Sequence, residues 1–94
     1  MPYIFVAYDI SDDRRRALVC EELKSLGFSM LQRSVYVARG GSSRAKDCAR
    51  AVQRLVRNDV DAVLVMVVPR EVLDKAITIG VGRTRIHEGN YAIL

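Results

Sequence analysis

The stretch PYIFVAYDISDDRRR, residues 2–16, decides how the chain begins to fold. Residues 2–9 are rich in aromatic and β-branched side chains, which predicts a strand that ends on Asp9. Three arginines, at positions 14 to 16, follow within a few residues. A soluble domain rarely places a carboxylate at the end of a buried strand without a partner. Asp9 is therefore a candidate for a structural anchor, a metal ligand or a catalytic group.

A helix is predicted directly after this strand. Ser11 is a good N-cap, and the two acids at 12 and 13 suit the positive end of a helix dipole. The helix is expected to run to about Leu26, where Gly27 stops it. Its apolar stripe has spacings of four and three and consists of Val19, Leu23 and Leu26, with Leu18 beside it.

The same reasoning divides the rest of the chain into short elements. Residues 28–39 read as two short strands that meet near Gln32–Arg33, and 40–43 as a loop ending in a serine cap. A second helix is expected to close near Asn58, and Pro69 stops the apolar strand at 61–68. The remaining elements follow in order: one helical turn at 70–76, an extended piece at 77–82, a polar loop at 83–90 and a terminal strand at 91–94.

The order of these elements predicts an α+β fold, a ferredoxin-like βαββαβ sandwich with an extra C-terminal strand. Residues 1–82 form the ferredoxin-like domain, and residues 83–94 form a C-terminal linker and strand. An antiparallel sheet covered by two helices usually leaves its other face polar, but both alternating sets of residues are apolar in YIFVAY and AVLVMVV. No segment of the chain is left over to cover this second apolar face. We therefore expect a sheet-to-sheet homodimer, in which the C-terminal strand is added to a sheet edge of the partner.

Composition limits the classes of function. A chain of 94 residues makes one domain, and its net charge of +4 favours an anionic partner, most simply nucleic acid. Aromatic residues are only 6% of the chain, so stacking of bases on an aromatic platform is not expected to dominate binding. Cys20 and Cys48 lie far apart, which predicts two free thiols in a cytoplasmic protein. No signal peptide is expected, and no apolar run reaches the roughly 20 residues of a membrane span.

Two interpretations of Asp9 remain open from its position alone. In a dimer packed through its sheets, two Asp9 carboxylates could face each other, and such a pair needs a shared proton or a cation. Mg²⁺ suits a site with few carboxylates and several waters. Alternatively, Asp9 only caps nearby amides.

The basic residues allow two interpretations as well. Arg14, Arg15 and Arg16 oppose the helix dipole, so they either contact phosphate or form a solvated cluster. On the second helix, Arg50, Arg54 and Arg57 are spaced for one face, a weak signal for backbone binding. His87 lies alone in a loop and is expected to be a surface residue.

VAYDISDD (6–13), LQRSVYVAR (31–39) and VVP (67–69), in this order and at this length, resemble the small CRISPR-associated adaptation protein family. The family is also known as CRISPR-associated endoribonuclease, the partner of the CRISPR integrase. The resemblance covers nearly the whole chain and implies a homodimer that acts in spacer acquisition. It further implies that the dimer bridges integrase subunits and holds a DNA duplex, and that some members cleave RNA or DNA with a metal ion.

The resemblance also implies roles for individual residues. Asp9 matches the family's metal-binding and catalytic aspartate, one from each protomer, which makes Mg²⁺ the expected cofactor. The other matching positions are expected to bind DNA or single-stranded RNA; they are Tyr8, Arg16, Arg33 and Ser34, to which the charge pattern adds Arg14. Leu18 stands where some members carry another arginine, so part of a nuclease site is missing. Two other classes stay open: a toxin-type endoribonuclease of the virulence-associated D kind, and a non-enzymatic ferredoxin-like regulatory module.

Overall fold

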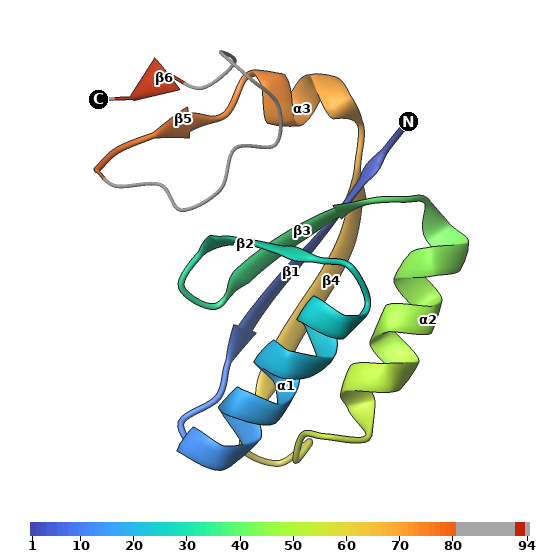
Figure 1. Cartoon of the computed structure of the whole chain (residues 1–94), viewed down its shortest axis with the longest axis vertical. Coiled ribbons are helices and arrows are strands. Elements are labelled where there is room, and N and C mark those ends of the chain that lie inside the picture. Colours follow the sequence, from blue (N-terminus) through green and yellow to red (C-terminus); the bar gives the residue numbers. More distant parts are fainter. Residues whose placement is uncertain (81–91, 94) are drawn as a thin grey trace.

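The computed structural model describes residues 1–80 and 92–93, and its core is a four-stranded antiparallel sheet (Figure 1). The strands lie in the order β2-β3-β1-β4. Their bounds are β1 Tyr3–Asp9, β2 Ser29–Gln32, β3 Val35–Arg39 and β4 Ala62–Val68. This order, with β1 in the middle and β4 at an edge, is that of a ferredoxin-like sandwich, which confirms the predicted fold class.

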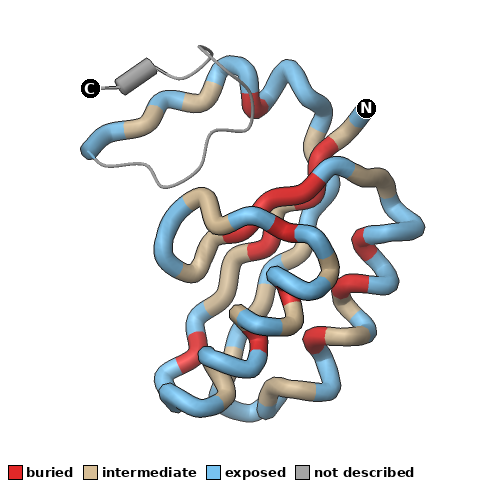
Figure 2. Tube along the Cα trace, in the orientation of Figure 1, coloured by how far each residue is buried: buried red, intermediate tan, exposed pale blue. Residues whose placement is uncertain are grey.

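Two helices, α1 (Asp13–Ser25) and α2 (Ser42–Gln53), pack on one face of the sheet. Ile4 and Val6 of β1 are fully buried beneath them, together with Val19 and Leu23 of α1. Figure 2 shows that the buried positions gather on the central strands and on the inner sides of both helices. Burial of this aliphatic layer supplies the main stabilisation of the domain.

The helix ends differ from the sequence prediction. Asp12, not Ser11, is the N-cap of α1, because its carboxylate accepts the backbone N–H of Arg15 at 2.9 Å. The predicted serine cap of the second helix was wrong as well, since Gly41 is the N-cap and the helix starts at Ser42. The predicted stop of the first helix at Gly27 is confirmed, with a φ of 89° that suits glycine.

The second helix is also shorter than predicted: it ends at Gln53 rather than near Asn58. The N–H of Leu55 bonds to the carbonyl of Val52, three residues back, which tightens and closes the last turn. The N–H of Arg57 donates instead to the carboxylate of Asp61 and is held in the loop before β4. The Asp61 side chain, from outside the helix, therefore holds the segment that follows α2.

The other face of the sheet is only partly covered. A short helix, α3 (Arg70–Asp74), places Leu73 against Tyr3 and Val37 at one end of this face. The expectation that no part of the chain covers the face was therefore wrong at that end. Toward the opposite end, Leu64 stays 55% exposed and Met66 42% exposed. We call this uncovered area, formed by Phe5, Ala7, Val35, Leu64 and Met66, the open face.

The C-terminal elements form a separate small ladder. β5 (Ile77–Thr78) pairs in parallel with β6 (Ala92–Ile93) of the same chain. The predicted terminal strand is therefore present. Its addition to a partner's sheet concerns a second chain and stays a prediction. The boundary between residues 82 and 83, and His87, lie outside the described residues.

Candidate functional site

Asp9 is the last residue of β1, opposite Ala62 of β4, and its side chain is exposed. Strand alternation places it on the same side of the sheet as Phe5 and Ala7, at the edge of the open face. It accepts no hydrogen bond from the part of the chain that the structure describes, whereas Asp12 caps α1. The interpretation of Asp9 as a local cap of backbone amides is therefore wrong.

The turn between β2 and β3 lies beside the carboxyl end of β1 (Figure 1). The N–H of Tyr8 donates to the carbonyl of Ser34 at 3.0 Å. Ser34 has a φ of 65°, a left-handed conformation that is uncommon for a residue other than glycine. The fold thus brings Arg33 and Ser34, which are far from Asp9 in the sequence, to the same end of the sheet.

Tyr8 faces the helices and belongs to an aromatic pair. Its ring stacks on Tyr36 of β3, with a centroid distance of 6.1 Å and an interplanar angle of 19°. The Tyr36 hydroxyl lies 2.7 Å from the thiol of Cys20 on α1, where either group can donate the hydrogen bond. Burial raises the pKa of both tyrosines, so both phenols are neutral hydrogen-bonding groups at ordinary pH.

Arg16 holds the loop between β1 and α1 in place. It donates to the carbonyl of Ile10 at 3.0 Å and forms an ion pair with Asp13. Its two terminal nitrogens therefore already have partners within the protein, although the side chain remains 40% exposed. Arg14 is exposed and has no ion-pair partner among the described residues, so its charge is available to an outside anion.

Arg15 has a different role from its two neighbours. It forms a two-point ion pair with Asp61, whose side chain is completely buried. The hydrogen bond from Arg15 and the N–H of Arg57 hold the pKa of Asp61 below its usual range. Sequence reasoning missed this pair, although an acid directly before the most apolar strand was a usable signal.

The arginines predicted on one face of the second helix, Arg50, Arg54 and Arg57, do not form a stripe. Because α2 ends at Gln53, Arg57 lies outside the helix, where it pairs with Asp59 at 2.9 Å. Arg50 pairs with Asp47 at the same distance. The predicted helical face of three arginines was therefore wrong.

Arg44 is also structural. It donates to the carbonyl of Leu26 at 2.6 Å and to that of Arg39, and it lies over the ring of Phe28 at 5.4 Å. Its charge lies beside the Leu26 carbonyl at the C-terminus of α1, where a cation is favourable.

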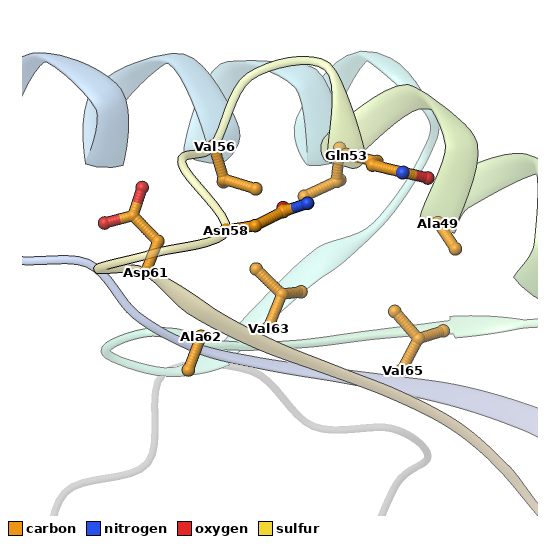
Figure 3. A pocket seen from close by; sticks show the side chains of 9 residues that line it. Ala49, Gln53, Val56, Asn58, Asp61, Ala62, Val63 and Val65 are labelled. Carbon is orange, nitrogen blue, oxygen red and sulfur yellow. The ribbon is translucent and has the colours of Figure 1, made fainter.

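A groove of about 430 Å³ lies between α2 and the edge strand β4 (Figure 3). Val63 and Val65 line its floor, with Ala49 and Gln53 of α2 above them. None of the predicted site residues lines the groove, so it is separate from the end of β1 where they gather.

Asp9 is the predicted metal ligand of the candidate site. Residues 1–80 and 92–93 contain no cluster of three or more carboxylate, histidine or cysteine side chains that could hold a metal ion. Asp9 alone offers a hard oxygen ligand, of the kind that Mg²⁺ prefers. The second carboxylate of the predicted pair belongs to a second chain, so the shared metal site stays a prediction.

The family model described as CRISPR associated protein Cas2 matches residues 1–76. The CRISPR-associated endoribonuclease Cas2 of Aeropyrum pernix is 42% identical over 80 residues, which cover 85% of this chain and 87% of the relative. A CRISPR-associated endonuclease Cas1/endonuclease Cas2 fusion of Thermoproteus tenax is 31% identical over 82% of this chain and 29% of its own length. A hypothetical protein from Thermus thermophilus has a solved structure that matches with a TM-score of 0.71 and 33% identity, over 87% of this chain and 94% of that chain.

These matches define the class of the protein as a small ferredoxin-like CRISPR-associated protein. The chain belongs to the CRISPR associated protein Cas2 family, as the match over residues 1–76 and the A. pernix relative show. In the described residues, no helix combines the length and apolarity that a membrane span requires.

Proposed function

We propose that this protein acts in CRISPR adaptation as a homodimer that bridges integrase subunits and holds incoming DNA. The observation that carries the proposal is the open face with Asp9 at its edge. Leu64 and Met66 expose a large apolar area that water disfavours, and a second copy is a matching cover. A two-fold axis through this face would bring the two Asp9 carboxylates toward each other.

The partner is inferred from a relative. The T. tenax protein joins a Cas1 endonuclease and a Cas2 endonuclease in one chain. A fusion keeps two proteins at a high effective concentration, which is useful when they work together. We infer that this chain binds a separate CRISPR integrase subunit, and that residues 83–94 add a strand to the sheet of the dimer partner.

Nucleic acid is the inferred ligand because of charge. The chain carries +4, and Arg14 and Arg33 are exposed without ion-pair partners among the described residues. The Arg16 side chain is 40% exposed, although it also pairs with Asp13. Phosphate contacts from such residues bind DNA or RNA without reading its sequence.

Cleavage is the weaker part of the proposed function. The names of the relatives state endoribonuclease or endonuclease activity. A Mg²⁺ ion held by paired Asp9 carboxylates would activate water and stabilise charge on a phosphate. The described residues contain no group of three or more carboxylate, histidine or cysteine side chains that could hold a metal ion. The main role is therefore architectural, with weak metal-dependent cleavage at most.

Reconstituted spacer integration tests the proposal. The purified chain is mixed with a CRISPR integrase subunit, a linear DNA duplex and a plasmid that carries a repeat array. Integration should depend on this chain and survive Asp9→Asn. Full integration without the chain, or its loss in an Asp9→Asn protein that still binds both partners, would contradict the architectural role.

A further inference from the structure

Ser34 occupies a conformation that its surroundings must hold. A residue other than glycine in the left-handed region costs on the order of 1 kcal/mol, so the native turn needs compensating contacts. The described contact is the hydrogen bond from the Tyr8 N–H to the Ser34 carbonyl. The position of the turn therefore depends on where Tyr8 is held.

Tyr8 is in turn held by Tyr36. The two rings stack, with their centroids 6.1 Å apart. Tyr36 is fully buried, so the direction of its ring is set by packing and by what its hydroxyl can reach. That partner is the Cys20 thiol, 2.7 Å away.

These contacts form a continuous path from α1 to the turn between β2 and β3. It runs from Cys20 through Tyr36 and Tyr8 to Ser34, and we call it the Cys20–Ser34 path. In the described residues, no buried side-chain polar atom lacks a hydrogen-bond partner. Loss of the Cys20 thiol therefore leaves the buried Tyr36 hydroxyl without its described partner, a cost that movement of the Tyr36 ring can relieve.

We propose that Cys20 and Tyr36 are positioning residues, which act through Tyr8 to fix the β2–β3 turn, and with it Arg33, beside Asp9. This inference rests on the proposed function only where it assigns Arg33 to nucleic acid. The stacking and the hydrogen bonds fix the position of the turn independently of any bound ligand. Neither Cys20 nor Tyr36 touches the ligand.

Two pairs of variants separate positioning from general stability. Cys20→Ala removes the partner of the Tyr36 hydroxyl, and Cys20→Ser restores a group that can donate and accept. Tyr36→Phe removes only the hydroxyl. Tyr3→Phe is its matched control, because Tyr3 is also buried and its hydroxyl accepts from Arg39 at 3.3 Å, outside the Cys20–Ser34 path.

Amide hydrogen exchange of the full-length protein measures the turn directly. The Tyr8 amide reports the bond to Ser34, and the Gly40 amide, which donates to Pro2 at 3.0 Å, reports the other end of β1. Tyr36→Phe and Cys20→Ala should speed exchange at Tyr8 about fivefold relative to Gly40, the size expected for one net hydrogen bond. Cys20→Ser and Tyr3→Phe should leave that ratio unchanged.

Binding of a fluorescein-labelled DNA duplex of mixed sequence supplies the second readout. Variants that loosen the turn should bind the duplex more weakly, by a factor no larger than that seen for Arg33→Ala. If the ratio of the amide exchange rate at Tyr8 to that at Gly40 is unchanged in Tyr36→Phe and Cys20→Ala, the positioning proposal is overturned. Failure of the proposed function is distinct: wild-type protein would then not bind the duplex, or Arg33→Ala would bind it normally, while the exchange ratio still changed as expected.

Discussion

Arg15 of α1 and Asp61, the residue before β4, form an ion pair with two contacts, at 2.8 Å from Nε and 3.2 Å from Nη2. The pair joins the start of α1 to the start of β4, which lies opposite Asp9. A buried carboxylate that loses its partner is costly, so this contact holds together the corner of the fold that carries the candidate site.

Asp61→Asn should change how stability depends on pH. The pKa of Asp61 is lowered in the folded protein, chiefly by Arg15, so its stabilisation is fully present above the unfolded value of about 3.9. That stabilisation is lost as the pH falls through the folded pKa. Thermal melts should show a lower Tm than wild type at pH 7, and a smaller decline in Tm below about pH 4.

Asp47→Asn is the control for this change, since Asp47 is exposed and pairs with an exposed arginine. It should keep the acid dependence of the wild type. If Asp61→Asn and wild type decline in parallel below pH 4, the Asp61 carboxylate does not contribute through its ion pair.

Leu64→Lys combined with Met66→Lys should separate the proposed dimer. Both side chains lie on the open face, and a buried charge there has no partner. Sedimentation at micromolar concentration should give about twice the 10.5 kDa chain mass for wild type and a single chain mass for the variant. Val60→Lys, at a 56% exposed position in the loop before β4, should remain dimeric. A monomeric wild type would contradict the sheet-to-sheet homodimer.

Asp9→Asn should abolish Mg²⁺-dependent cleavage and leave binding of a DNA duplex within about twofold of wild type. The substitution keeps the shape of the side chain but removes the charge that a divalent ion requires. Cleavage and binding are measured on the same preparation, with Asp47→Asn as a control for the loss of one negative charge. Normal cleavage by Asp9→Asn would show that the metal site lies elsewhere.

Arg14→Ala should flatten the salt dependence of DNA binding. If Arg14 neutralises one phosphate, the slope of log K against log salt should fall by about 0.9. Arg50→Ala is the matched control, because Arg50 already pairs with Asp47. Titrations of a labelled duplex at several salt concentrations give the slopes. Equal slopes for Arg14→Ala and wild type would place the phosphate contacts on other residues.

Gly40→Ala should destabilise the fold by about 1–3 kcal/mol. Gly40 has a φ of +153°, and an added Cβ would lie 2.9 Å from both Ile4 Cδ1 and Arg44 Cδ. Urea unfolding measures the free energy of unfolding. Gly41→Ala is the control, since its Cβ would meet only Pro2 at 3.8 Å. Equal stability of the two variants would show that the backbone at Gly40 adjusts without strain.

The order of the strands and helices was readable from the sequence because periodicity is a local property. The strand that ends on Asp9, the two short strands that meet near Gln32–Arg33 and the stop at Gly27 were predicted correctly. The apolar open face was also visible, since β4 has hydrophobic residues in both alternating sets. The family resemblance rested on the same local stretches.

Tertiary structure decided which polar groups meet. Arg15 and Asp61 are 46 residues apart, and Cys20 and Tyr36 are 16 apart, so no local pattern could pair them. The stripe of arginines failed for a different reason, because α2 ends at Gln53 and Arg57 lies beyond it. A charged side chain can point to solvent, to a carbonyl or to a distant acid, and only the packing of the elements decides among these partners.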